Sequence, residues 1–270
     1  YDTLSLPWAR IFVAAMFVGV LFTSDRKRIP INSATILLFT FFLWTTFTLN
    51  FTVYPAHSFS AWTEFAKIVL VFFITVAVIN TPERLHAVVW ILVLALGYYS
   101  VKGGIFVLLT AGNYHVLGAP TTAFAETNGM ARACIMMFPL ALYLALQSAD
   151  RMVRIGAVGA TLLTLLSLVG TGSRGGLIGF GAQLAVLFLY SRHKMRLAIV
   201  GVAVVLLALA VLPAERLAGF TGRMSTIEDY KEVDSANQRF KAWDYAMAMA
   251  AAHPLTGGGF GAFAGNVGLV

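Results

Sequence analysis

Long apolar runs separated by short polar segments make up most of the chain. A helix that crosses the hydrocarbon core of a bilayer needs about 20 such residues. Roughly eight runs approach that length, although the third, sixth, seventh and eighth are short for a straight span. They cover residues 6–23, 34–53, 66–80, 86–109, 129–147, 155–169, 175–190 and 197–212. The pattern predicts an all-α polytopic membrane protein with about eight transmembrane helices in this fragment.

The composition supports this prediction. Hydrophobic residues make up 59% of the 270 residues and charged residues only 11%, whereas a soluble domain carries about 25% charged residues. The formal net charge of +7 raises the question of nucleic acid as a partner. Because the charges lie in short loops between apolar runs, membrane topology and contact with phospholipids explain them instead, and we expect no nucleic-acid partner.

The lysines and arginines predict an orientation. They follow the first, third, fifth and seventh runs, and the positive-inside rule places these loops in the cytoplasm. The residues concerned are Arg26, Lys27, Arg28, Arg84, Arg151, Arg154, Arg192, Lys194 and Arg196. The outer side then holds the segments 54–65, 112–127 and 170–176 and everything after Pro213.

This pattern divides the chain into two regions. Residues 1–213 form a transmembrane helical bundle, and residues 214–270 form a periplasmic segment with an amphipathic helix. Since the first residue is Tyr1 and not Met, and no closing spans follow, we expect a fragment truncated at both ends.

An arginine, which is always positively charged, lies at the predicted outer corner between the sixth and seventh runs. Arg174 lies in the stretch TGSRGG, and Ser173 is placed to cap the helix that follows. A helix N-terminus already favours anions, and an arginine there adds positive charge that the isolated helix does not need. The Gly172/Gly176 and Gly175/Gly179 spacings allow another helix to approach closely. Arg174 is therefore either a fixed anion site or an interfacial arginine that reaches lipid headgroups.

A second arginine, Arg239, repeats this arrangement in the last polar segment. Ser235 and Gln238 have the spacing of a capping box, and the helix should run to about Ala252, before Pro254. Phe240, Trp243, Met247 and Ala250 recur at helical spacing. This predicts a helix in the outer interface, although a plain amphipathic helix with a solvated arginine fits as well.

Two further cations, Lys102 and Arg132, lie within apolar runs. A charge inside a bilayer costs at least about 2.5–3.5 kcal/mol, so such residues usually pair or face a polar cavity. Glu126 is near enough in sequence to pair with Arg132. We predict that Glu126, Asn128 and Arg132 line the same cavity as Arg174, with Lys102 and Ser173 in support.

Metal and nucleotide sites are not indicated. The five histidines show no paired-ligand spacing. The glycine-rich stretch GGGFGAF (257–263) follows His253 and Pro254 without a preceding strand, so a tight turn is the better interpretation. The single cysteine, Cys134, lies in an apolar run and suits core packing.

Three stretches carry a resemblance to a known family: TGSRGGLIGF, ETNGMARACIMMFPLALYL, and SANQRFKAWDYAMAMAAAHPLTGGGFGAF. In this order they resemble the O-antigen ligase and polymerase superfamily. The stretch GYYSVKGGIFVLLTAG and the first runs are most similar to the putative O-glycosylation ligases associated with exosortase systems. The resemblance extends over essentially the whole chain.

The resemblance implies a function. Members transfer a glycan from an undecaprenyl-diphosphate carrier to an acceptor hydroxyl of a glycan, lipid or protein on the periplasmic side of the bacterial inner membrane. It implies that Arg174 and Arg239 bind the donor diphosphate, with no metal and no nucleotide sugar. The histidine that serves the family as a base after the glycine turn is not present in this chain, so we expect the fragment alone to be inactive.

Other functions remain open. A polysaccharide polymerase uses the same carrier and differs in its acceptor. A transporter or flippase for an anionic lipid-linked substrate would suit Lys102 and Arg132, but the chain shows none of the inverted repeats that are common in transporters. A non-catalytic scaffold in an export complex is a third alternative.

Overall fold

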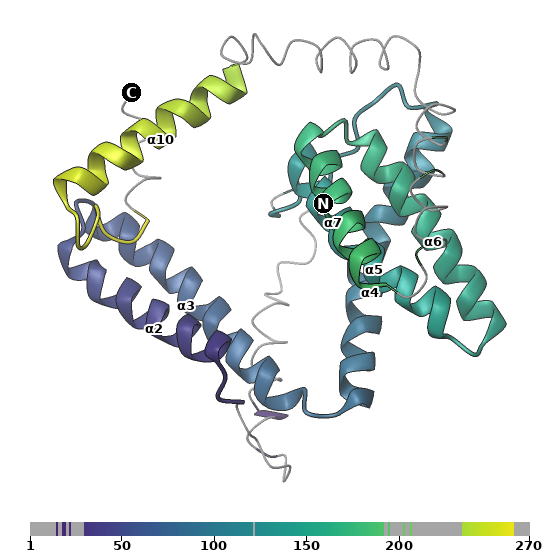
Figure 1. Cartoon of the computed structure of the whole chain (residues 1–270), viewed down its shortest axis with the longest axis horizontal. Helices are drawn as coiled ribbons and strands as arrows, with labels where there is room; N and C mark the ends of the chain where they lie inside the picture. The colour runs from purple at the N-terminus through teal and green to yellow at the C-terminus, as the bar shows by residue number, and fades with distance from the viewer. Residues whose placement is uncertain are drawn as a thin grey trace, which may run out of the picture. The chain divides into compact units, whose positions relative to one another are not determined.

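The computed structural model describes residues 30–120, 122–191 and 234–261, together with residues 15, 18, 19, 22, 194, 202 and 206. Every regular element within the described residues is a helix, which confirms the predicted all-α class in this part of the chain (Figure 1). The elements are α2 (Ser33–Thr48), η1 (Leu49–Phe51), α3 (Pro55–Val78), α4 (Pro82–Leu109), α5 (Thr127–Gln147), α6 (Arg151–Gly170), α7 (Arg174–Tyr190) and α10 (Asp234–Ala252).

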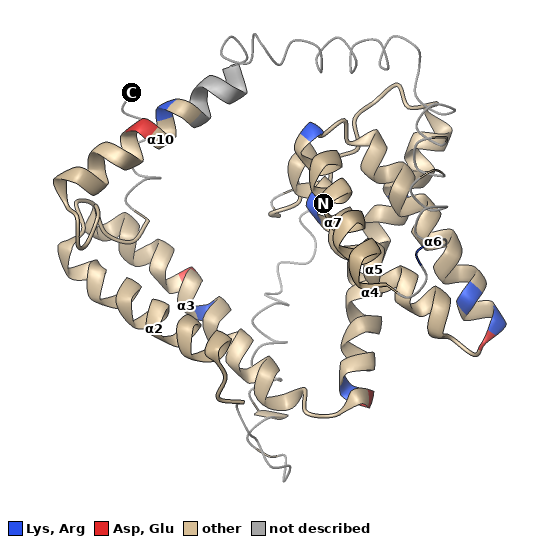
Figure 2. Ribbon diagram, viewed as in Figure 1, with Lys and Arg blue, Asp and Glu red and all other residues tan. Residues whose placement is uncertain are grey.

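Within the described residues, five stretches of helix are long and apolar enough to cross a membrane. They are α2 continued by η1, then α3, α4, α5 and α6, while α7 with 17 residues is a shorter apolar helix. Charged residues are sparse along them, as the few blue and red segments of the ribbon show (Figure 2). Six of the predicted runs therefore coincide with apolar helices, and the protein is a multi-pass membrane protein. The runs 6–23 and 197–212 lie outside the described residues except at isolated positions, so the count of about eight stays a prediction.

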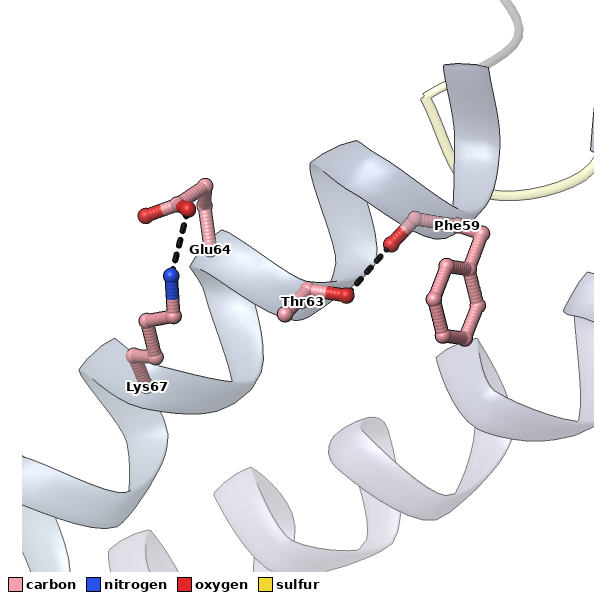
Figure 3. Close-up of polar contacts among 4 residues, drawn as sticks. All are labelled: Phe59, Thr63, Glu64 and Lys67. Atoms are coloured by element: carbon pink, nitrogen blue, oxygen red, sulfur yellow. Dashed lines mark hydrogen bonds and ion pairs between the residues drawn. The ribbon is translucent and has the colours of Figure 1, made fainter. Parts of the chain in front are cut away.

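Helix α3 corrects one expectation. The segment 54–65 was expected as an outer loop and the third run as a short span, but α3 begins at Pro55 and extends over 24 residues. Proline suits the first turn of a helix, where its missing N–H is not needed. The polar side chains of this half have local partners: Thr63 donates to the Phe59 carbonyl at 2.7 Å, and Lys67 pairs with Glu64 at 2.6 Å (Figure 3). Both contacts join groups within one helical turn, so the polar residues of this half are accommodated in the helix.

The start of α6 is a second correction. Arg151 and Arg154 were expected in a loop before a short sixth run, but both lie in the first turn of α6. Asp150 caps this turn, because its Oδ1 accepts hydrogen bonds from the backbone N–H groups of Met152 and Val153 at 2.7 and 3.4 Å. The cap lengthens α6 to 20 residues, enough for a span.

The chain divides into two compact units, residues 1–85 with 229–270 and residues 86–228. In the second unit, α5 packs against both α6 and α7. Its core combines Met130, Phe138, Leu165, Leu168 and Phe180, all nearly inaccessible to solvent. Small residues bring the backbones together. A Cβ on Gly104 of α4 would lie 2.2 Å from the Leu163 carbonyl oxygen of α6, and one on Gly176 of α7 would lie 2.5 Å from Ala131 of α5.

In the first unit, α2 and α3 pack through aromatic rings, with Phe42 stacked on Trp62 at 5.8 Å between centroids. The glycine-rich segment after α10 is the expected tight turn, with positive φ at Gly257, Gly259 and Gly261. It contacts the α2–α3 connection, where the Val53 N–H donates to the Gly258 carbonyl at 3.1 Å.

Helix α10 ends at Ala252, as predicted. Because it already includes Asp234, Ser235 lies within the helix and is not its N-cap. The predicted apolar side is exposed, with Trp243 at 61% and Met247 at 64%.

Candidate anion site at the corner between α6 and α7

The corner that carries Arg174 is built by its own short polar side chains. The Thr171 hydroxyl donates to the Leu168 carbonyl at the end of α6 and accepts the Ser173 N–H at 3.2 Å. Gly172 takes a φ of +66°, which lets the chain reverse. The Ser173 hydroxyl accepts the Gly176 N–H at 3.0 Å, which confirms the predicted N-cap of α7.

A residue from α5 completes the cap. The Ser173 hydroxyl, besides accepting from Gly176, donates to Asn128 Oδ1 at 2.6 Å. Asn128 lies in the first turn of α5, and one turn further along, Ala131 touches the backbone of Gly176. The N-terminal ends of α5 and α7 therefore meet at this corner. The Ser173 hydroxyl is a hydrogen-bond donor to α5 and an acceptor for α7.

Arg174 is the first residue of α7 and is half-buried. Within the part of the chain that the structure describes, its guanidinium makes no hydrogen bond and no ion pair. A helix N-terminus carries about half a positive charge, to which the guanidinium adds a full one. Five N–H donors in a planar fork suit phosphate oxygens, so this corner is able to hold an anionic phosphate group.

Arg132 and Glu126 do not form the ion pair that the sequence allowed. Arg132 is exposed on α5, one turn beyond Asn128, and its Nη2 donates to the Ala123 carbonyl at 3.3 Å. Glu126 is exposed at the N-cap position of α5. Among the described residues, the ion pair is the one between Glu64 and Lys67. That Glu126, Asn128 and Arg132 line one cavity with Arg174 stays a prediction.

The remaining predicted cations are not brought to this corner by described contacts. Lys102 is exposed on α4, without a hydrogen bond or ion pair inside the described segments. The side chain of Arg239 lies outside the described residues, and α10 belongs to the first unit whereas Arg174 belongs to the second. The convergence of Arg174 and Arg239 on one diphosphate therefore stays a prediction.

One residue at the corner was missed by sequence reasoning. His115, from the loop between α4 and α5, has its Nδ1 3.1 Å from the Thr171 carbonyl oxygen. The next residue, Val116, donates its N–H to the Gly170 carbonyl at 3.0 Å. Two contacts thus fix the loop against the corner. The sequence predicted only that the segments 112–127 and 170–176 lie on the same, outer side of the membrane, and not that His115 contacts the corner.

The described side chains offer no metal centre. No three His, Cys, Asp or Glu side chains gather where the structure describes them in a way that would hold an ion. The chemistry available at the corner is that of one arginine cation, N–H donors, a hydroxyl, an amide and an imidazole.

Comparison with known families covers nearly the whole chain. Residues 159–268, which include most of α6, the corner, α7 and α10, match the model of a family described as O-antigen ligase. Residues 3–149, with α2 to α5, match a family of unknown function, DUF5935. No curated protein and no solved structure matches the chain. Because the second match covers more than half of the 270 residues, the chain belongs to the DUF5935 family, and its C-terminal part carries an O-antigen ligase domain.

Proposed function

We propose that this protein is a bacterial inner-membrane glycan ligase. It transfers a glycan from an undecaprenyl-diphosphate carrier to an acceptor hydroxyl on the periplasmic side. The O-antigen ligase domain supports a membrane glycan enzyme of the glycosyltransferase or ligase type that uses a lipid-linked glycan. The N-terminal half resembles the exosortase-associated ligases, and we propose that subgroup for it.

The observation that carries the proposal is the unpaired guanidinium of Arg174 at the start of α7 within the described residues. Arg174 is the first residue of α7, and its guanidinium has no acidic partner within the described residues. The hydroxyl of the neighbouring Ser173 already makes two hydrogen bonds, one as donor and one as acceptor. In the reaction, the bond between the anomeric carbon and the phosphate oxygen breaks, and the diphosphate leaves with the electron pair. Arg174 binds the diphosphate and stabilises the charge that develops on it.

The other cations complete this proposed site. Arg239 of α10 is the second arginine for the diphosphate, and the exposed apolar side of α10 lies in the outer interface. Lys102, Arg132, Glu126, Asn128 and Ser173 support the donor headgroup. The reaction needs neither a metal nor a nucleotide sugar. The acceptor is a glycan, a lipid or a protein, and membrane lipids surround the bundle.

A substitution that keeps the charge tests the proposal. In the full-length protein, reconstituted with an undecaprenyl-diphosphate-linked glycan and a set of acceptors, Arg174→Lys should reduce transfer at least about 100-fold. Lysine cannot supply two parallel donors to one phosphate. The matched control is Arg151→Lys, at the other end of the second unit, which should leave transfer unchanged.

The same assay separates the alternatives. Full transfer by Arg174→Lys contradicts the diphosphate role of this arginine. Elongation of a growing glycan as the only product identifies a polymerase. Movement of the lipid-linked donor between leaflets without a new glycosidic bond identifies a flippase.

A further inference from the structure

The glycine turn after α10 (residues 257–261) packs against the connection between α2 and α3. Both segments belong to the first unit, and they lie side by side in Figure 1. The Val53 N–H donates to the Gly258 carbonyl at 3.1 Å, and Gly258 is buried. The next ring, that of Phe260, packs on Phe65 of α3 with 5.2 Å between centroids. A backbone hydrogen bond and a ring contact therefore join the turn to this connection.

The glycines of the turn meet different needs. Gly257 has a φ of +59° and nothing within 4 Å of a Cβ among the described residues, so glycine serves only the backbone conformation there. Gly259 has a φ of +88°, and its Cβ would lie 2.5 Å from the Cβ and 2.6 Å from the Cα of Thr52. A Cβ on Gly261 would lie 3.0 Å from the Cβ of Ala61. A turn that only ended α10 would not need these two close approaches.

The surface that receives Gly259 is fixed by its own hydrogen bonds. The hydroxyls of Thr52 and Ser58 share a hydrogen bond of 2.5 Å, and Ser58 is fully buried. The Thr52 hydroxyl also accepts the Tyr54 N–H at 3.3 Å. Because Thr52 is held from both sides, it presents a defined surface to the turn.

The turn is continuous with α10, so whatever holds the turn also directs the helix. The His253 N–H donates to the Met249 carbonyl at 3.0 Å, and the Gly257 N–H donates to the His253 carbonyl at 2.8 Å. Arg239 precedes the helix end at Ala252 by about 13 residues, or about 20 Å along the axis. A tilt of α10 by about 10° about the turn would therefore move residue 239 by about 3 Å.

We propose that the connection between α2 and α3 positions α10, through the glycine turn, so that Arg239 reaches the donor diphosphate. The inference rests on the proposed function, in which Arg239 is the second arginine for that group. It gives a role to the region that matches a family of unknown function, since Thr52 and Phe65 come from that region and the turn from the O-antigen ligase region. Both are positioning residues, and they act through α10.

Two alanine substitutions in the same turn test this role. In the full-length protein, Gly259→Ala puts a Cβ into the space of Thr52 and should reduce glycan transfer about 10- to 100-fold, because a misplacement of about 1 Å costs up to about 100-fold. The matched control is Gly257→Ala, which also places alanine at a positive φ but meets open space, and it should keep transfer within about threefold.

A third variant covers the case in which Gly259→Ala does not accumulate in the membrane. Phe260→Leu removes the ring contact with Phe65 without adding a Cβ to the turn, and it should reduce transfer in the same direction. Transfer by Gly259→Ala or Phe260→Leu that equals the wild-type rate overturns the inference.

Coupling to Arg239 distinguishes positioning from general support of the fold. In an Arg239→Ala background, Gly259→Ala should reduce transfer by at most a further factor of about two, because the group that it misplaces is already gone. In an Arg174→Ala background, the same substitution should keep its full effect. Equal factors in the two backgrounds mean that the turn only supports the fold, and they overturn the inference.

A disulfide gives a readout that is independent of transfer. A Cβ on Gly261 would lie close to the range of about 3.5–4.5 Å that disulfides need from the Cβ of Ala61. Oxidation of Ala61→Cys/Gly261→Cys should therefore form a disulfide, detected by mass spectrometry, and should leave transfer intact. Ala61→Cys/Gly257→Cys is the control and should stay reduced.

This readout keeps the two proposals distinguishable. If the wild-type protein transfers no glycan, the ligase function fails, while the disulfide still supports the turn as the anchor that directs α10. If the wild-type protein transfers glycan but no disulfide forms, the positioning inference alone is overturned. Loss of transfer on oxidation that reduction restores also overturns it, because the turn would then have to leave the connection during the reaction.

Discussion

At the scale of single residues, Gly172 meets two demands that a residue with a side chain could not meet together. Its φ of +66° is costly for a residue with a side chain, and the His115 ring occupies the space that a Cβ would need. We expect Gly172→Ala to lower the free energy of unfolding by at least about 1–2 kcal/mol, measured by denaturant titration in bicelles.

A neighbouring glycine provides the control for this substitution. Gly175 is helical, and a Cβ there would meet nothing within 4 Å. Gly175→Ala should therefore leave stability unchanged or raise it by up to about 1 kcal/mol. Equal stability of Gly172→Ala and the wild-type protein would mean that the corner adopts another backbone conformation.

Local contacts at the corner were predictable, and distant ones were not. The Ser173 cap joins residues three apart, so the sequence shows it directly. The contacts of Ser173 with Asn128 and of His115 with Thr171 join residues 45 and 56 apart, and no periodicity reports such a distance. Arg132 donates to a backbone carbonyl, which residue types do not reveal. Charge alone instead suggested an ion pair with Glu126.

At the scale of elements, α4 and α6 cross at a glycine. A Cβ on Gly104 would lie 2.2 Å from the Leu163 carbonyl oxygen, a backbone atom that cannot move without bending α6. Gly104→Ala should destabilise the protein by about 1–3 kcal/mol in the same titration. Gly159→Ala, in α6 with nothing within 4 Å, is the matched control and should not destabilise. Unchanged stability of Gly104→Ala would show that the helices separate at little cost.

The apolar runs predicted which segments are helices, whereas the residue at which each helix begins depended on individual capping residues. All the runs from 34–53 to 175–190 coincide with apolar helices, because burying backbone polar groups in lipid requires a helix. The polar turns at the start of α3 and α6 were assigned to loops, because hydropathy does not register the stabilisation supplied by Pro55 or Asp150.

At the scale of the whole molecule, the two family regions are interleaved. The region of unknown function contributes α2 and α3 to the first unit and α4 and α5 to the second. The O-antigen ligase region contributes α6 and α7 to the second unit and α10 to the first. Polarity suggested a division at residue 213, but polarity does not report which helices contact each other. Neither family region forms a unit by itself.

The orientation of the second unit gives the last prediction. At one end, the loop with His115 is bonded to the corner before Arg174. At the other end, α5 stops at Gln147 and α6 begins at Arg151, where Arg154 donates to the Ser148 carbonyl at 2.8 Å. The positive-inside rule places the end with Arg151 and Arg154 in the cytoplasm and the His115 end in the periplasm.

Cysteine labelling measures this orientation directly. Leu117 and Ala149 are exposed in the two connections, and the native Cys134 is only 1% exposed and gives little background. In the full-length protein, a membrane-impermeant maleimide should label Leu117→Cys in intact spheroplasts, because its loop faces the periplasm. It should label Ala149→Cys only after lysis, since that turn faces the cytoplasm. The reverse pattern would put Arg174 and His115 on the cytoplasmic side, where a carrier-linked glycan displayed in the periplasm cannot reach them.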